Sequence, residues 1–172
     1  MITHTSTLKK LTTWCCSALV TLAICLPVGL VQAGEMALKG KEVGKTTEVT
    51  WLQIGDDESH GIGTYQVSWL IFLEDGQVGT ATDKGTFESN KGVGTHQGYY
   101  VTTFPDGSKQ ILKYHGTSKP IGEKTNAIQG TSIYIGGTGR FEGMKGEGTY
   151  TGTQYDNGMY SLDFDAKVTV PD

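Results

Sequence analysis

Residues 160–170 alternate apolar and polar side chains without interruption. Tyr160 begins an apolar series at every second position that ends at Val170, and Ser161 begins the intervening polar series. A β-strand places successive side chains on opposite faces, so this spacing is typical of a strand with one buried and one solvated face. No stretch of helical length after residue 33 keeps a 3.6-residue apolar repeat. The pattern therefore predicts an all-β chain.

Seven other segments are rich in β-branched and aromatic residues at alternate positions, as strands are. They are residues 48–54, 62–73, 77–89 (interrupted near Lys84-Gly85), 93–104, 109–118, 127–135 and 145–155. Most connections are short, and three contain Asp-Gly or Asn-Gly, which tight hairpin turns favour. Eight strands joined in this way form an antiparallel meander.

Such a meander can close into a barrel that is filled by side chains or holds one small ligand. A two-sheet sandwich is the alternative, but it needs long crossover connections, and only residues 119–126 offer one. We therefore predict a single-domain, eight-stranded antiparallel β-barrel.

Residues 1–33 have the organisation of a signal peptide. Lys9 and Lys10 supply the positive start, residues 14–30 are mainly apolar, and Val31-Gln32-Ala33 supplies the small residues that signal peptidase requires. We predict cleavage after Ala33, a barrel domain over residues 34–172, and a secreted or periplasmic location.

A retained N-terminal anchor and a lipoprotein cut before Cys25 are the alternatives for this segment. The chain becomes polar from Gly34 onward, which is unlike the flank of an anchor. Ile24 occupies the position at which a lipoprotein signal needs a small residue. Both observations favour the cleaved signal peptide.

All three cysteines, Cys15, Cys16 and Cys25, lie in the predicted leader. The predicted mature chain therefore has no disulfide, no thiolate nucleophile and no cysteine ligand for zinc. Cleavage also removes the two leader lysines, which lowers the formal net charge from −4 to −6. An acidic surface repels nucleic acid and anionic membranes, so we expect no nucleic-acid partner and no membrane insertion after cleavage.

A glycine-rich connection, Gly-Gly-Thr-Gly-Arg-Phe-Glu-Gly over residues 136–143, joins two of the predicted strands and is followed by Lys145-Gly146. This run resembles a segment of the allene oxide cyclase and dirigent-protein superfamily. In that superfamily Gly-Thr-Gly-[Arg/Lys]-Phe-x-Gly-x-x-Gly joins two late strands of an eight-stranded barrel. The match covers this run closely and the rest of residues 34–172 only in general pattern.

The resemblance implies a structural role for five residues of the run: Gly137, Gly139, Arg140, Phe141 and Gly143. In this role Phe141 closes one end of the barrel and Arg140 bonds carbonyls of the loops. The resemblance also implies an exported bacterial member of the superfamily, a small and mostly apolar molecule in the interior, and a homodimer or homotrimer. The catalytic carboxylates and prolines of the superfamily have no matching positions here, so no catalytic residue is transferred.

The candidates for lining the interior are aromatic and imidazole side chains on predicted strands: Tyr65, Trp69, His96, Tyr100, Tyr114 and His115. A tyrosine offers apolar contact together with a hydroxyl that orients a ligand, and histidine titrates near neutral pH. Simple packing within the sheet is the alternative for each. The two histidines lack a third ligand at metal-binding spacing, so we predict neither a metal nor a cofactor.

Carboxylates suited to acid–base chemistry are not evident from the pattern. Asp163 and Asp165 fall on the solvated face of the last predicted strand, and residues 56–58 form an acidic loop. Three functions stay open at this point. They are binding of a small hydrophobic molecule, a cyclase or isomerase that acts by confining its substrate, and a non-catalytic structural surface protein.

Overall fold

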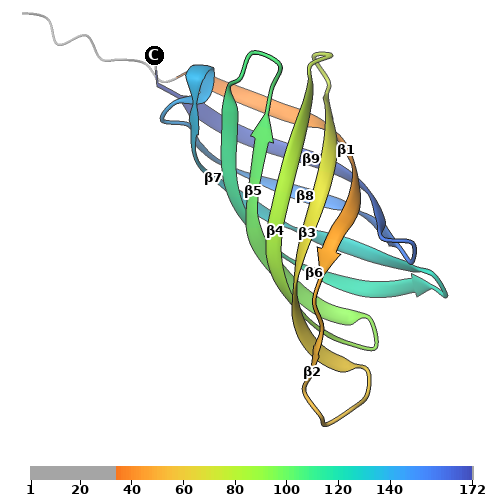
Figure 1. Cartoon of the computed structure of the whole chain (residues 1–172). Helices are drawn as coiled ribbons and strands as arrows, with labels where there is room; N and C mark the ends of the chain where they lie inside the picture. Colours follow the sequence, from red (N-terminus) through yellow and green to blue (C-terminus); the bar gives the residue numbers. More distant parts are fainter. Residues whose placement is uncertain (1–33, 172) are drawn as a thin grey trace, which may run out of the picture. The chain divides into compact units, whose positions relative to one another are not determined.

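A computed structural model describes residues 34–171, and these form an antiparallel β-barrel (Figure 1). Its strands are β1 (Gly34–Val49), β2 (Leu52–Gln53), β3 (His60–Leu73), β4 (Val78–Asn90), β5 (Val93–Thr103), β6 (Lys109–Gly122), β7 (Thr125–Thr138), β8 (Lys145–Tyr155) and β9 (Met159–Val170). A single turn of 3₁₀-helix, η1 (Gly139–Phe141), separates β7 from β8. Among the described residues, no helix is long and apolar enough to cross a membrane.

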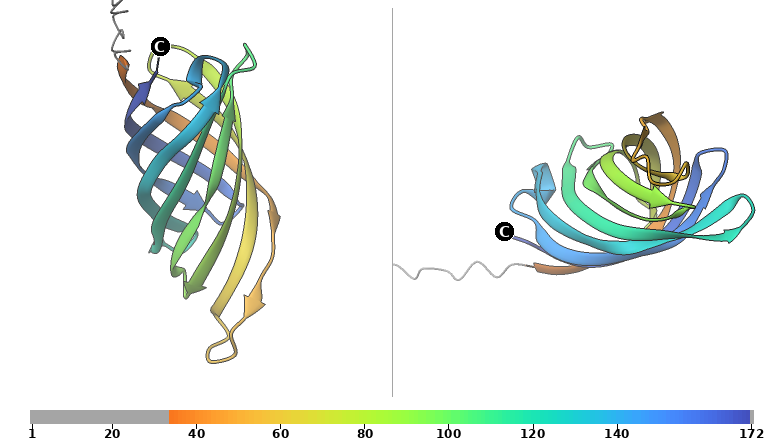
Figure 2. Two further views of the ribbon diagram at one scale, coloured as in Figure 1. Left: turned by 90° about the vertical axis from the view of Figure 1, so that its left-hand side faces the viewer. Right: turned by 90° about the horizontal axis from the view of Figure 1, so that it is seen from below.

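Strand β1 closes the barrel because it pairs on both of its edges. Gly40 is opposite Phe164 of β9 and also opposite Leu73 of β3. The remaining strands follow one another in chain order from β3 to β9. Figure 2 shows the strands tilted around one common axis. The closed eight-stranded antiparallel barrel is as predicted. The extra short strand β2, which pairs only with β3, was not predicted.

Three predicted boundaries were wrong. The first strand runs over Gly34–Val49 instead of residues 48–54, because inward glycines and Glu42 conceal its alternation. β4 continues through Lys84-Gly85 without interruption, since Gly85 lies beneath the Tyr65 ring of β3. Residues 119–126, predicted as a loop, are largely strand, because β6 continues to Gly122 and β7 begins at Thr125, and the two strands pair there.

The glycine-rich run seals one end of the barrel. Phe141 is buried and packs on Phe104, with 5.2 Å between ring centroids. Met144 is fully buried beneath them. Gly139 and Gly143 have φ values of 62° and 71°, in the left-handed region that favours glycine. Phe141 thus belongs to the buried core at this end of the barrel.

Arg140 packs against the outside of the barrel at the η1 end, and its contacts differ from those predicted. Its guanidinium lies 4.9 Å from the Phe104 ring centroid and 4.7 Å from that of Phe141. It donates to the side-chain oxygen of Gln77 and lies 3.4 Å from the Asp106 carboxylate. The partners are thus rings and polar side chains of the neighbouring hairpins, whereas backbone carbonyls were predicted.

Arg140→Ala is expected to lower the free energy of unfolding by about 1–2 kcal/mol, because two cation–π contacts and an ion pair are lost. Arg140→Lys should recover only part of this, since an ammonium cannot stack as a planar guanidinium does. Urea unfolding measures both variants. Lys113→Ala, which removes an exposed charge from the outer face of β6, is the control, and equal effects of Arg140→Ala and Lys113→Ala would contradict this role.

Candidate functional site

A cavity of about 520 Å³ occupies the half of the barrel away from η1. Its mouth lies among the hairpins β4–β5, β6–β7 and β8–β9, which contribute Gly92, Lys124 and Asp156. Its floor is formed by side chains from the middle of the strands, including Trp69, Tyr100 and Leu162. Because Phe141 and Met144 seal the opposite end, the cavity opens at one end only.

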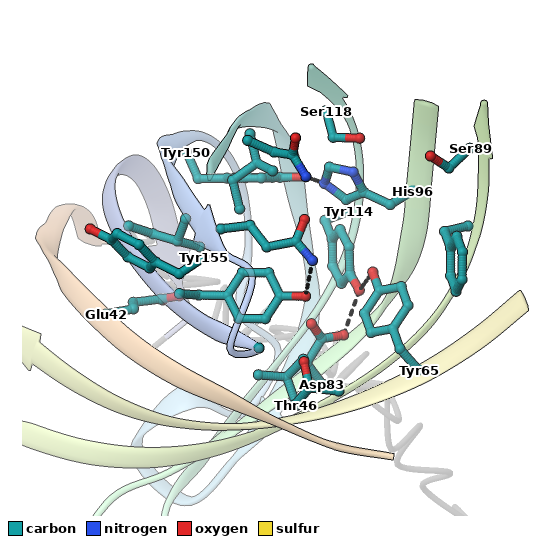
Figure 3. A pocket seen from close by; sticks show the side chains of 18 of the residues that line it. Glu42, Thr46, Tyr65, Asp83, Ser89, His96, Tyr114, Ser118, Tyr150 and Tyr155 are labelled. Carbon is teal, nitrogen blue, oxygen red and sulfur yellow. Dashed lines mark hydrogen bonds between the residues drawn. The ribbon is translucent and has the colours of Figure 1, made fainter. Parts of the chain in front are cut away.

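Asp83 is the most deeply buried charged residue in the cavity wall, with 5% of its surface exposed. The Tyr114 hydroxyl donates a hydrogen bond to Oδ1 of Asp83, and the Tyr65 hydroxyl lies 2.5 Å from that of Tyr114 (Figure 3). Burial raises the pKa of Asp83 to about 7, although Tyr114 and the nearby Trp69 indole act in the opposite direction. The Trp69 N–H itself makes no hydrogen bond of normal geometry. Asp83 can therefore accept or donate a proton near neutral pH.

Glu42 is a second interior carboxylate, contributed by β1. Burial raises its pKa to about 7, and the negative charge of Asp83 adds to the rise. The neighbouring Tyr100 phenol opposes the rise, yet its buried hydroxyl forms no hydrogen bond of normal geometry. Two coupled carboxylates thus face the same cavity, and each changes charge in the neutral range.

Other parts of the cavity wall carry neutral hydrogen-bonding groups. His96 Nε2 lies 2.8 Å from the Tyr150 hydroxyl (Figure 3). Gln154 donates to the Tyr160 hydroxyl at 2.9 Å. Burial, with a smaller contribution from His115, lowers the pKa of His96 to about 4. Burial also raises the pKa values of the Tyr150 and Tyr160 phenols. These groups therefore stay uncharged at neutral pH.

His96 is expected to stay neutral between about pH 5.5 and pH 8, because burial disfavours the imidazolium. Its ring-proton NMR shifts should be constant over that range. His60 serves as the internal control, because its carboxylate neighbours Asp56 and Glu88 raise its pKa. A midpoint for His96 at or above the ordinary histidine value would contradict the buried, uncharged state.

Five of the six predicted lining residues lie in the cavity wall: Tyr65, Trp69, His96, Tyr100 and Tyr114. The sixth, His115, was placed wrongly. It follows Tyr114 in an extended strand, so the two side chains point to opposite faces. His115 is exposed on the outer face of β6, beside the Thr131 hydroxyl at 3.3 Å. The sequence reasoning also missed Glu42 and Asp83, the two interior carboxylates.

No group of three or more histidine, cysteine, aspartate or glutamate side chains within residues 34–171 has the arrangement of a metal site. Asp163 and Asp165 lie on the outer face of β9, as predicted, where they pair with Lys41 and Lys39 at 2.7 Å each.

A comparison with solved structures finds a similar fold in dirigent proteins. The structure of the pterocarpan synthase dirigent protein GePTS1 has a TM-score of 0.50 and 13% sequence identity, over 84% of this chain and 94% of that chain. That of the pterocarpan synthase dirigent protein PsPTS1 has a TM-score of 0.48 and 13% identity, over 81% and 97% of the two chains. No protein-family model and no curated protein matches the chain. At such low identity the likeness concerns the fold alone, and the chain folds as a dirigent-like β-barrel.

Proposed function

We propose that this barrel binds a small, mainly hydrophobic molecule in its interior. The observation that carries the proposal is the cavity of about 520 Å³ with one mouth and an aromatic wall. Pockets for small molecules typically measure about 300–1,000 Å³ and combine apolar walls with a few polar groups. A protein with a purely structural role would be more stable if side chains filled this cavity, because protein interiors are normally close-packed.

A second candidate function, a cyclase or isomerase that confines its substrate, is supported by Asp83 and its two phenols. A carboxyl group with a pKa of about 7 can transfer a proton at neutral pH. Tyr114 and Tyr65 form a hydrogen-bonded chain from this group along the cavity wall. Such an enzyme would fold its substrate against the wall and protonate it from Asp83.

Two further expectations stay predictions. The leader that suggests export lies outside the described residues, so the secreted or periplasmic location rests on residues 1–33 as a sequence. A homodimer or homotrimer likewise rests on the family resemblance. Export is tested by N-terminal sequencing of the protein from its host, with Gly34 as the expected first residue.

Binding is tested with a variant that fills the cavity. Ile128 lies in the cavity wall on β7, whereas Ile133 of the same strand is exposed on the outer face. Ile128→Trp should reduce uptake of the neutral dye Nile red at least about tenfold, which corresponds to about 1.4 kcal/mol. Ile133→Trp should leave uptake unchanged.

The same variants permit a search for the natural ligand. Native mass spectrometry of protein from its own host should show a bound small molecule on the wild type and on Ile133→Trp, and none on Ile128→Trp. Circular dichroism establishes that both variants are folded. Equal dye binding by all three proteins would contradict an interior site.

A further inference from the structure

The cavity is lined by five carboxylates but by a single cationic side chain. The carboxylates are Glu42, Asp83, Glu88, Glu123 and Asp156, and the cation is Lys124. Lys124 lies at the mouth, 3.6 Å from Asp156, and so is already paired. His96 is uncharged at neutral pH because its pKa is lowered by burial. The cavity therefore has a negative electrostatic potential, which attracts positively charged molecules.

The two innermost carboxylates have no positive partner within residues 34–171. The ion pairs of the described chain involve outer-face and mouth residues, and none includes Glu42 or Asp83. A buried carboxylate without a counter-charge is strongly disfavoured. Two such groups in one cavity leave a place for a cation that the protein itself does not supply.

Aromatic rings surround this place. Trp69 packs against Tyr100 and Tyr160, with ring centroids 6.0 Å and 5.4 Å apart. Tyr134 and Phe164 also line the cavity. Rings beside carboxylates are surroundings in which proteins bind organic ammonium groups, because the negative ring faces attract a cation electrostatically.

We propose that the ligand is an organic cation: a protonated amine or a quaternary ammonium group on an apolar body. The ammonium group lies on the floor between Glu42 and Asp83, against the rings of Trp69 and Tyr100. The apolar body extends toward the mouth, past Phe87 and Tyr155. This inference rests on the proposed function and specifies its ligand class.

A cation that needs the ionised carboxylates binds more tightly as pH rises. Below about pH 7 it must displace protons from Glu42 and Asp83, and its affinity falls. The phenols of Tyr65, Tyr114, Tyr134, Tyr150 and Tyr160 face the same space, but burial raises their pKa values and they stay neutral. His60 contacts the lining residue Glu88, and the carboxylates of Asp56 and Glu88 raise the pKa of His60, so a His60→Gln variant is measured alongside.

The experiment compares two probes of equal shape, benzyltrimethylammonium and neopentylbenzene, by displacement of Nile red between about pH 5.5 and pH 8.5. The expected result at high pH is binding of the cation at least about tenfold tighter than binding of its neutral isostere, equivalent to about 1.4 kcal/mol. This preference should shrink at low pH in the wild type and in His60→Gln.

Removal of an interior charge should affect only the cationic probe. Asp83→Asn and Glu42→Gln should each weaken benzyltrimethylammonium about tenfold and leave neopentylbenzene within about twofold. Asp163→Asn, which removes a carboxylate from the outer face, should change neither. If one interior variant does not fold, the other provides the same comparison.

The outcomes separate the two proposals. Equal or tighter binding of neopentylbenzene at every pH would overturn the organic-cation inference while leaving the interior binding site intact. Failure of the wild type to take up Nile red and both probes would overturn the binding function and the inference together.

Discussion

Gly116→Val is expected to destabilise the barrel by about 3 kcal/mol or more, although valine is otherwise the better strand residue. Gly116 faces the interior on β6, opposite His96 of β5 and Gly130 of β7. A Cβ atom there would collide with the Tyr150 hydroxyl and the Gln129 backbone oxygen, and would lie 2.7 Å from His96 Nε2. The substitution therefore forces two strands apart and breaks the His96–Tyr150 hydrogen bond.

The matched control is Gly136→Val on β7. A Cβ atom at Gly136 has no neighbour within 4 Å, and its φ is outside the left-handed region. This variant should change the free energy of unfolding by no more than about 0.5 kcal/mol. Chemical denaturation monitored by circular dichroism compares the two proteins. Equal stability of Gly116→Val and Gly136→Val would contradict the close approach of the Tyr150 hydroxyl to Gly116 of β6.

Asp83→Asn is expected to stabilise the protein at alkaline pH and to have little effect in acid. The pKa of Asp83 is raised from 3.8 to about 7 in the folded protein. At pH values between 3.8 and about 7, Asp83 is protonated in the folded state but ionised in the unfolded state. The stabilising contribution of this group is therefore complete below about pH 4, declines as pH rises, and is lost above about pH 7. Asparagine can accept the Tyr114 hydrogen bond and carries no charge at any pH.

The stability advantage of Asp83→Asn over the wild type should accordingly grow by about 2–4 kcal/mol between about pH 4.5 and pH 8.5. Urea unfolding at several pH values measures this difference. Asp163→Asn, on the exposed face of β9, is the control and should show no such trend. A constant difference between Asp83→Asn and the wild type across this range would contradict a buried carboxyl that titrates near neutrality.

The inward position of Asp83 was within reach of sequence reasoning. Asp75-Gly76 marks the hairpin between β3 and β4, and the Tyr65–Leu73 face of β3 is evident from its alternation. Pairing the strands outward from that turn puts Asp83 opposite Val67, and residues opposite each other share a face. The signal was overlooked because Gly79, Ala81 and Gly85 make the inner face of β4 nearly devoid of large apolar residues.

Glu42 could not have been found in the same way. It lies opposite Leu162 and Ile71, and both pairings join segments that are distant in the chain. No turn sets the register of β1 against either neighbour, so local patterns carry no information about which of its residues face inward. An inward glutamate also weakens the apolar alternation by which strands are recognised. Closure of the barrel, a long-range property, places this carboxylate.

The position of His115 illustrates a simpler error. Tyr114 and His115 are adjacent in one strand, and strict alternation allows only one of them to face inward. The same rule separates Tyr99 from Tyr100, and there the structure has Tyr100 buried and Tyr99 exposed. Consistent use of alternation would have excluded His115 from the interior.

The pairing of Gly34 with Val170, beside the sealed end at Phe141, has a practical consequence. The last strand ends on the side remote from the cavity mouth, where Pro171 approaches Gly143. A fluorescent tag or a surface linker attached after Pro171 would therefore leave the cavity mouth unobstructed. Immobilisation through this end of the chain would present the mouth to the solution.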